Sequence, residues 1–407
     1  MHAGTASAPA RLQTPSATRI LVASGLGLLF DAMDVSLISF VLVVLGKEWS
    51  LSPVWSGVLG SMGFAGMAVG SALAGLLADH FGRRRVFIWT LLVYSIATGL
   101  TAFAPGVAIF LVLRFLVGLG LGGELPVATT YVNESSPDAV RGRRVVLLEA
   151  FWAGGSLVAA ILSRIVIPSI GWRYVFLFGA LPALYAIVIR YALPETPKFS
   201  QVMRKAHMRT ALRTLFARPF LRATAVTWVL WFIMNFCYYG ISLWLPSLLA
   251  KQGYSVVTSL SYVLIMILAQ IPGYLTAAWL VERWGRKKTL VSAMLLTAFA
   301  AVGFGFAPST AWLIVFGLLV NYFMLAAFAG TYVFTVEQFP VRARASGIGW
   351  ASGFGRIAGI IAPSFVGLLV AAHATFAAIF LCFCCAMLVG FAVVAWAGRE
   401  TKGRLVD

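Results

Sequence analysis

The stretch Glu134-Ser-Ser-Pro137-Asp-Ala-Val-Arg141 recurs 203 residues later as Glu337-Gln-Phe-Pro340-Val-Arg-Ala-Arg344, with the acid, the proline and the base at the same spacing. A second pair keeps this offset, because Asp-His-Phe-Gly-Arg at 79–83 is followed by Glu-Arg-Trp-Gly-Arg at 282–286. A fixed internal period should be read before any local feature, and this one is half as long as the chain. The sequence therefore predicts two homologous halves rather than short stacked repeats.

The composition places these halves in a membrane. Of the 407 residues, 61% are hydrophobic and 11% are charged, and the mean hydropathy is +0.93. A water-soluble fold could not bury so much apolar surface. The predicted fold is an all-α membrane protein in which twelve transmembrane helices form two pseudo-symmetric six-helix halves. The twelve stretches of membrane-spanning length are 18–45, 54–78, 86–104, 107–132, 146–168, 172–193, 223–249, 256–281, 289–307, 311–335, 346–370 and 374–397.

The basic residues orient the chain. The net charge of +18 suggests nucleic acid as a partner, but the positions of the 31 Lys and Arg residues argue against it. With the N-terminus inside, only Lys47, Arg173 and Lys251 lie in outer loops, while most of the others lie in inner loops and tails. By the positive-inside rule, both termini are expected in the cytoplasm. The expected location of the protein is the cell (inner) membrane.

The predicted division of the chain follows from the same pattern. The central basic segment is expected to lie along the inner membrane surface, where its charges face lipid headgroups; it acts as a linker and orientation signal or, alternatively, as a regulatory site. The expected parts are a cytoplasmic N-terminal tail (1–17), a first six-helix half (18–195), the basic linker (196–222), a second six-helix half (223–398) and a cytoplasmic C-terminal tail (399–407).

Enzymatic and metal-binding motifs are not found in the sequence. All four cysteines fall inside predicted spans, and the four histidines are scattered, so no metal-ligand spacing exists. Nucleophile elbows, phosphate loops and dinucleotide fingerprints are also missing from the sequence. We therefore expect no enzyme activity, no cofactor and no bound metal.

Several motifs resemble those of a transporter family. Gly75-Leu-Leu-Ala-Asp79-His-Phe-Gly82-Arg83-Arg84-Arg85 resembles the loop 2–3 signature of the major facilitator superfamily, and Glu282-Arg-Trp-Gly285-Arg286 resembles its second copy in loop 8–9. The run Arg114-x-x-x-Gly118-x-Gly120-x-Gly122 is similar to the glycine-rich proton-coupling helix of this family. The resemblance covers the whole chain. It implies alternating access about a midplane site between the halves, and carriers of this kind generally work as monomers.

Two further motifs resemble a narrower group. Pro194-Glu-Thr-Pro197 is similar to the segment that ends the first half of sugar porters, and Phe30-Asp-Ala-Met-Asp-Val35 resembles the first span of aromatic-acid/proton symporters and bacterial niacin permeases. The resemblance implies proton-coupled import of a small organic anion, with nicotinate as the expected substrate. The alternative substrate is another aromatic acid such as benzoate or hydroxycinnamate. A non-transporting receptor built on a carrier fold is the rival from another class.

The repeated loop motifs predict a cytoplasmic gate. Asp79 can accept hydrogen bonds and pair with a basic residue of the other half, while Gly82 permits the turn that directs Arg83 toward the bundle. Simple anchoring of helix ends is the alternative reading. Loop 8–9 departs from the family pattern at its acid and at its leading glycine position. We therefore expect its contribution to the gate to be weaker than that of loop 2–3. The expected gate residues are Asp79, Gly82, Arg83, Glu134, Arg141, Glu282, Arg286, Glu337 and Arg344.

Ionisable residues at membrane depth are costly and therefore candidates for function. Asp31 and Asp34 lie three residues apart in span 1, and Arg114 lies in span 4. In related symporters an aspartate matching Asp34 pairs with an arginine matching Arg114. A movement that separates such a pair would make the buried carboxylate take up a proton, which predicts a proton-coupling device. A static ion pair that fixes helix packing is the alternative.

The substrate site is predicted around Arg356 in span 11. Organic-anion carriers resemble this chain in placing an arginine there, and a guanidinium matches a carboxylate in bidentate geometry. The alternative role is a structural partner of Glu124 or Asp31. An aromatic and amide stripe on span 7 is expected to hold the ring, unless it serves only packing. The remaining substrate-site candidates are Trp228, Phe232 or alternatively Trp231, Asn235 and Tyr239 of span 7 with Gln270, Asn321, Tyr131 and Glu124, and Glu149 is a further residue that could bond substrate or relay protons.

Overall fold

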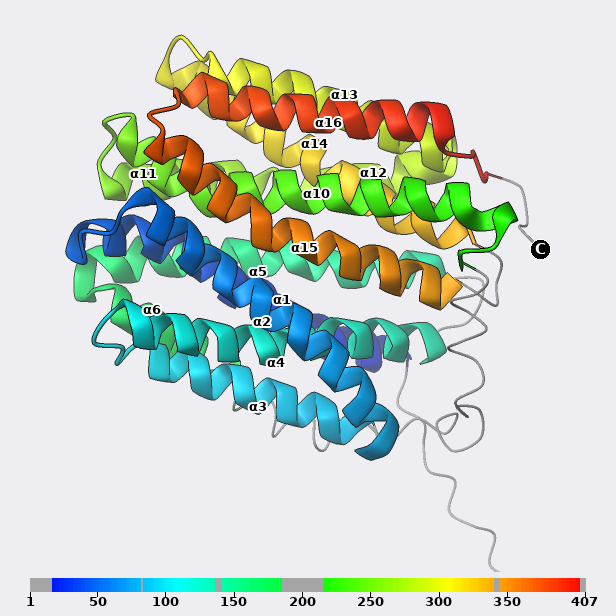
Figure 1. The fold of residues 1–407 in the computed structure, drawn as a ribbon, viewed down its shortest axis with the longest axis horizontal. Coiled ribbons are helices and arrows are strands. Elements are labelled where there is room, and N and C mark those ends of the chain that lie inside the picture. Colours follow the sequence, from blue (N-terminus) through cyan, green and yellow to red (C-terminus); the bar gives the residue numbers. More distant parts are fainter. Residues whose placement is uncertain are drawn as a thin grey trace, which may run out of the picture.

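A computed structural model of the chain describes residues 17–81, 83–135, 141–182, 184, 215–339 and 344–402. In this part of the chain all regular structure is helical (Figure 1). The first half contains α1 (Ala17–Glu48), α2 (Pro53–Phe81), α3 (Arg83–Thr101), α4 (Val107–Ser135), α5 (Arg141–Ile170) and α6 (Trp172–Gly179). The second half contains α10 (Arg218–Lys251), α11 (Val256–Leu268), α12 (Gln270–Trp284), α13 (Arg286–Gly305), α14 (Thr310–Glu337), α15 (Arg344–Ala371) and α16 (Phe376–Ala397).

Helices occupy eleven of the predicted membrane stretches, and α6 occupies the start of the sixth, 172–193, of which the structure describes only the first part. Eight candidate spans within the described residues are long and apolar enough to cross a bilayer, and α11 and α12 together form one of them, Val256–Trp284. The interruption at Ala269 has a local cause, because Pro272 has no N–H to donate to the carbonyl of Leu268. A helix satisfies its own backbone hydrogen bonds, which makes it suitable for a membrane interior.

The helix pairings of the first half recur in the second. In the first half α1 packs on α5, α2 on α4, and α3 on both α4 and α6. The equivalent pairs in the second half are α10 with α15, α12 with α14, and α13 with both α14 and α16. Figure 1 shows the first set of helices in its lower part and the second set in its upper part. The internal period of the sequence thus corresponds to a repeated pattern of packing.

The second half begins earlier than the predicted boundary at 223. Helix α10 starts at Arg218, with a proline in its first turn, where a missing N–H costs no hydrogen bond. The guanidinium of Arg222 donates to the backbone carbonyls of Trp396 and Ala397, both at 2.9 Å. The basic end of the predicted linker is therefore the first turn of α10, tied to the end of α16.

Glycines in α4 let it pack closely on α2. A Cβ atom added at Gly118 would overlap the carbonyl oxygen of Gly63, and one added at Gly122 would overlap that of Met67. Small residues of this kind allow helix backbones to approach one another in membranes. The glycine-rich run that follows Arg114 therefore has a packing role in this structure.

The two halves meet closely at the end of the bundle away from the start of α10 and the end of α16. The hydroxyl of Ser39 on α1 donates to the carbonyl of Ser242 on α10 at 2.7 Å, and the hydroxyls of Ser61 and Ser364 are 2.9 Å apart. A Cβ atom added at Gly57 of α2 would lie 2.7 Å from the carbonyl oxygen of Pro363 on α15. These contacts close this end of the interface between the halves.

Candidate functional site

A central cavity of about 720 Å³ lies between the two halves. Its walls come from α1, α2, α4 and α5 of the first half and from α10, α12, α14 and α15 of the second. Its walls combine apolar and aromatic side chains with a few polar groups, as the walls of small-molecule sites do. Its charged lining residues in the described chain are Asp31, Glu149 and Arg356.

Arg356 supplies the positive charge of this cavity. Among the residues that the structure describes, no carboxylate lies within ion-pair distance of its guanidinium. A Cβ atom added at the neighbouring Gly355 would meet the side-chain nitrogen of Asn235 at 2.6 Å and the carbonyl oxygen of Trp231 at 2.9 Å. The glycine thus lets α15 approach α10 and brings Arg356 beside the aromatic face of α10. Such a guanidinium can bind an incoming carboxylate without first breaking an ion pair to any of the described carboxylates.

The face of α10 that lines the cavity carries Trp231, Asn235, Tyr238 and Tyr239. The ring of Trp231 lies edge-to-face against Tyr332 of α14, with centroids 4.8 Å apart, and its indole N–H donates to Thr335 at 3.0 Å. The ring of Tyr239 is 4.3 Å from that of Phe64 on α2. Because these rings are fixed by neighbours from other helices, the cavity has a preformed aromatic wall.

Two predicted ring-binding residues lie elsewhere. Trp228 stacks on Phe354 of α15, with centroids 4.9 Å apart at 22°, and Phe232 packs between Phe236 and Phe354. Neither lines the central cavity. Trp228, Phe232 and Phe236 recur every four residues and form the neighbouring stripe of α10. The prediction that Trp228 and Phe232 line the cavity is therefore corrected here. Trp231 belongs instead to the stripe of α10 that lines the cavity.

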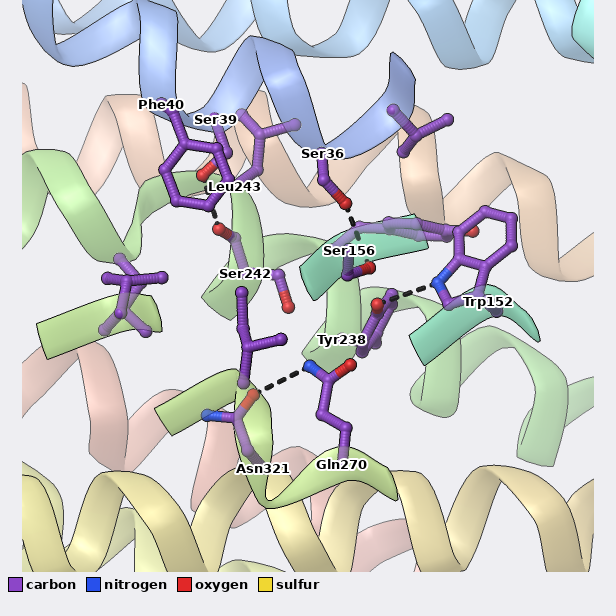
Figure 2. A pocket seen from close by; sticks show the side chains of 15 residues that line it. Ser36, Ser39, Phe40, Trp152, Ser156, Tyr238, Ser242, Leu243, Gln270 and Asn321 are labelled. Carbon is purple, nitrogen blue, oxygen red and sulfur yellow. Dashed lines mark hydrogen bonds between the residues drawn. The ribbon is translucent and has the colours of Figure 1, made fainter. Parts of the chain in front are cut away.

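Gln270 and Asn321 belong to a second cavity of about 490 Å³ (Figure 2). The side-chain amide of Gln270 donates to the side-chain oxygen of Asn321 at 2.8 Å, and both residues are buried. Ser36 and Ser156 also bond each other at its wall, at 3.0 Å. The two amides do not line the cavity that holds Arg356, so they are not placed to contact the same small ligand at the same time.

An aromatic layer separates the two cavities. The indole N–H of Trp152 on α5 donates to the hydroxyl of Tyr238 on α10 at 2.8 Å, as Figure 2 shows. Trp152, Tyr238 and Tyr239 line both cavities. The hydrogen bond joins the two halves of the protein at the wall that the two cavities share.

The predicted pair of Asp34 and Arg114 is present and buried. The guanidinium lies 3.2 Å from one carboxylate oxygen of Asp34, and Thr98 donates to the other oxygen at 2.6 Å. Arg114 also donates to Thr101 at 3.1 Å and lies over the ring of Phe176 at 4.8 Å. The pair therefore has both charged and neutral hydrogen-bond partners, which is what a charge in a membrane interior requires.

Asp31 and Asp34 have different surroundings although they lie three residues apart. Asp31 lines the central cavity, whereas Asp34 and Arg114 line a smaller adjacent cavity of about 310 Å³. Phe64 and Met67 of α2 line both cavities, so these two side chains form a layer shared by the central cavity and the cavity of the ion pair.

Three predicted gate residues come together at the end of the second half where α10 begins and α16 ends. Arg286 pairs with Glu337 at 2.9 Å and with Glu282 at 3.5 Å. Thr401 donates to Glu337 at 2.5 Å, and Glu400 accepts the backbone N–H of Arg286 at 3.0 Å. These described pairs lie within one half and include its C-terminal segment.

Other predicted residues fall outside what the structure describes. Gly82 is not described, and nothing is described of the side chains of Asp79, Arg83, Glu124, Tyr131, Glu134, Arg141 and Arg344. Sequence reasoning did not propose nine of the described residues that line the cavity, namely Phe64, Met67, Leu121, Trp152, Tyr274, Leu325, Phe328, Tyr332 and Ser352. Aromatic residues are frequent throughout this chain, so their type alone does not single out the ones that line a cavity.

The Major Facilitator Superfamily model matches residues 25–276 and 260–406. The chain belongs to this superfamily. It is accordingly a multi-pass membrane transporter rather than an enzyme, and its predicted twelve-helix fold is confirmed. A solved D-xylose–proton symporter has the same fold, with a TM-score of 0.79, 20% identity, and coverage of 96% of this chain and 99% of that one.

Two relatives within the superfamily match nearly the whole chain. A Bacillus subtilis (strain 168) protein, provisionally named niacin/nicotinamide transporter NiaP, is 46% identical over 96% of this chain and 98% of its own length. The niacin transporter NiaP of Acinetobacter baylyi (strain ATCC 33305 / BD413 / ADP1) is also 46% identical, over 94% of both chains.

Proposed function

We propose that this transporter imports nicotinate across the cell (inner) membrane by alternating access of its two six-helix halves, with both termini in the cytoplasm and the monomer as the working unit. The observation that carries the proposal is Arg356, a cationic group in an aromatic cavity between the halves. The names of the two relatives at 46% identity support the same substrate.

Nicotinate combines a carboxylate with a flat aromatic ring, and the cavity offers a partner for each. Arg356 binds the carboxylate through its planar fork of N–H donors. Trp231, Tyr239 and Tyr332 contact the ring, since their side chains line the same cavity and are fixed by ring–ring packing. Nicotinamide lacks the charge that Arg356 would bind and is the weaker ligand of this site.

Transport is coupled to protons through Asp34 and Arg114. In the closed pair each charge neutralises the other at 3.2 Å. When rearrangement of the halves moves Arg114 away, the isolated carboxylate is costly in the membrane interior and takes up a proton. The layer formed by Phe64 and Met67 links this event to occupation of the central cavity.

Uptake of labelled nicotinate into proteoliposomes, with and without an inward proton gradient, tests the proposal. We expect gradient-stimulated uptake by the native protein and almost none by Arg356→Ala. The matched control is Arg173→Ala, which removes an exposed arginine paired with Glu48 at the outer surface. Unlabelled benzoate and nicotinamide serve as competitors. Uptake of nicotinate that is indifferent to Arg356, or preferred uptake of benzoate, would refute the proposal.

A further inference from the structure

The central cavity holds a buried carboxyl group that the transport scheme above does not use. Glu149 of α5 is only 4% exposed and lines the cavity from the half opposite to Arg356. Its Oε1 atom has no hydrogen-bond partner in the described part of the chain. The hydroxyl of Tyr332, another residue of the cavity wall, lies close to the same carboxyl group. One oxygen of Glu149 thus lacks a hydrogen-bond partner among the described residues at the wall of this cavity.

The groups around Glu149 make its charge depend on the ligand. The described titratable and charged groups of the cavity that face it from the helices around α5 are Asp31 of α1, Tyr238 and Tyr239 of α10, Tyr274 of α12, Tyr332 of α14 and Arg356 of α15. If both carboxyls are ionised, the single guanidinium leaves the described lining with a net negative charge. A bound carboxylate adds another negative charge in a site of low dielectric, where like charges repel strongly. Uptake of one proton relieves this repulsion.

A protonated Glu149 would also contribute to recognition. A carboxylic acid is a hydrogen-bond donor, whereas a carboxylate only accepts. Nicotinate has an acceptor besides its carboxylate, the ring nitrogen, which lies meta to the carboxylate on the ring. Arg356 and Glu149 lie in opposite halves of the protein on the walls of one cavity, so a ligand held by both would bridge the halves.

We propose that Glu149 is protonated when the substrate is bound and that its acid group donates a hydrogen bond to the ring nitrogen of nicotinate, while Arg356 holds the carboxylate. The inference rests on the proposed function and adds a proton-linked specificity residue to it. It requires binding to weaken as pH rises and Glu149 loses its proton. It also requires nicotinate to be preferred over benzoate, which leaves the buried donor unpaired.

Equilibrium binding of nicotinate and benzoate to the purified protein, from mildly acidic to mildly alkaline pH, tests this inference. For the native protein we expect the Kd for nicotinate to rise with pH, approaching tenfold per pH unit as one proton is lost. Glu149→Gln keeps a donor without a titratable proton, so it should bind nicotinate with a Kd that does not change over this range. Glu149→Leu removes the donor, so its preference for nicotinate over benzoate should fall by roughly tenfold.

Two further variants keep the test decisive. Glu48→Gln removes an exposed carboxylate at the outer surface and should leave both the pH slope and the ligand preference unchanged. Glu149→Asp keeps a titratable acid and should retain a pH slope with weaker binding, even if the other substitutions at this position impair folding. Size-exclusion profiles and thermal stability report the folding of each variant.

The outcomes separate this inference from the proposed function. If the native protein binds nicotinate but Glu149→Gln keeps the native pH slope, or Glu149→Leu keeps the native preference, the role of Glu149 is wrong and nicotinate transport stands. If the native protein binds benzoate and not nicotinate, both the proposed substrate and the hydrogen bond to a ring nitrogen are wrong.

Discussion

Ser39 donates a hydrogen bond to the carbonyl oxygen of Ser242, the residue 203 positions further along the chain. This separation equals the internal period of the sequence, so the bond joins equivalent positions of α1 and α10. It lies at the closed end of the interface, where Ser61 and Ser364 are also in contact. Contacts between the halves that close one end of the bundle must break when the protein opens toward that side.

Cross-linking this closed end should stop transport. The hydroxyl oxygens of Ser61 and Ser364 are 2.9 Å apart, so sulfur atoms at these positions can form a disulfide with little backbone movement. We expect oxidised Ser61→Cys/Ser364→Cys protein to lose nearly all uptake into proteoliposomes and to regain it after reduction. Each single variant, treated with the same oxidant, is the control. Full uptake by the oxidised double variant, with the cross-link verified by mass spectrometry, would contradict the need to open at this end.

The two aromatic stripes of α10 should differ in their effect on binding. Trp231 lines the central cavity, whereas Trp228 stacks on Phe354 outside it. We expect Trp231→Ala to raise the Kd for nicotinate by about tenfold, since an aromatic contact and the buried ring area are both lost. Trp228→Ala, the matched control on the same helix, should change the Kd little. Equal effects of the two substitutions would show that the cavity does not bind the ring.

The fold is largely predictable from this sequence because two strong signals agree. Hydropathy marks the membrane stretches, and the repeat of Glu134 through Arg141 as Glu337 through Arg344 relates one set of six to the other. Each lipid-facing helix must satisfy its backbone internally, so spans of this length have few alternatives. The boundary at 223 was less predictable, because the first turn of α10 is basic and its contact with α16 is tertiary.

The site is less predictable because both sides of several helices are apolar and aromatic. The ion pair of Asp34 and Arg114 follows from family resemblance, and Arg356 stands out by its charge. Periodicity cannot decide whether Trp231 or Phe232 faces the cavity, because adjacent stripes of α10 both carry rings. The position of Gln270 depends on the interruption between α11 and α12. Its separation from Arg356 depends on the aromatic layer to which both halves of the protein contribute.

Close packing of α2 on α4 should make Gly118 sensitive to small additions. A Cβ at this position would overlap the carbonyl oxygen of Gly63, so Gly118→Ala forces the backbones apart. We expect a loss of about 1–3 kcal/mol of stability, visible as a lower unfolding temperature in detergent. Gly353→Ala is the control, because a Cβ there has no heavy atom within 4 Å. An unchanged unfolding temperature for Gly118→Ala would mean that the helices can separate at no cost.

The ion pair of Asp34 and Arg114 should be required for accumulation but not for exchange. Asp34→Asn keeps the shape of the side chain and can still bond Thr98, but it can no longer bind and release a proton. We expect this variant to exchange internal for external nicotinate and to lose uphill accumulation under an inward proton gradient. Thr98→Val, which removes a neutral hydrogen bond worth about 0.5–1.5 kcal/mol, should keep gradient-driven accumulation. Uphill accumulation by Asp34→Asn would assign proton coupling to another residue, and a loss of both exchange and accumulation with normal folding would mean that the pair serves binding or gating instead.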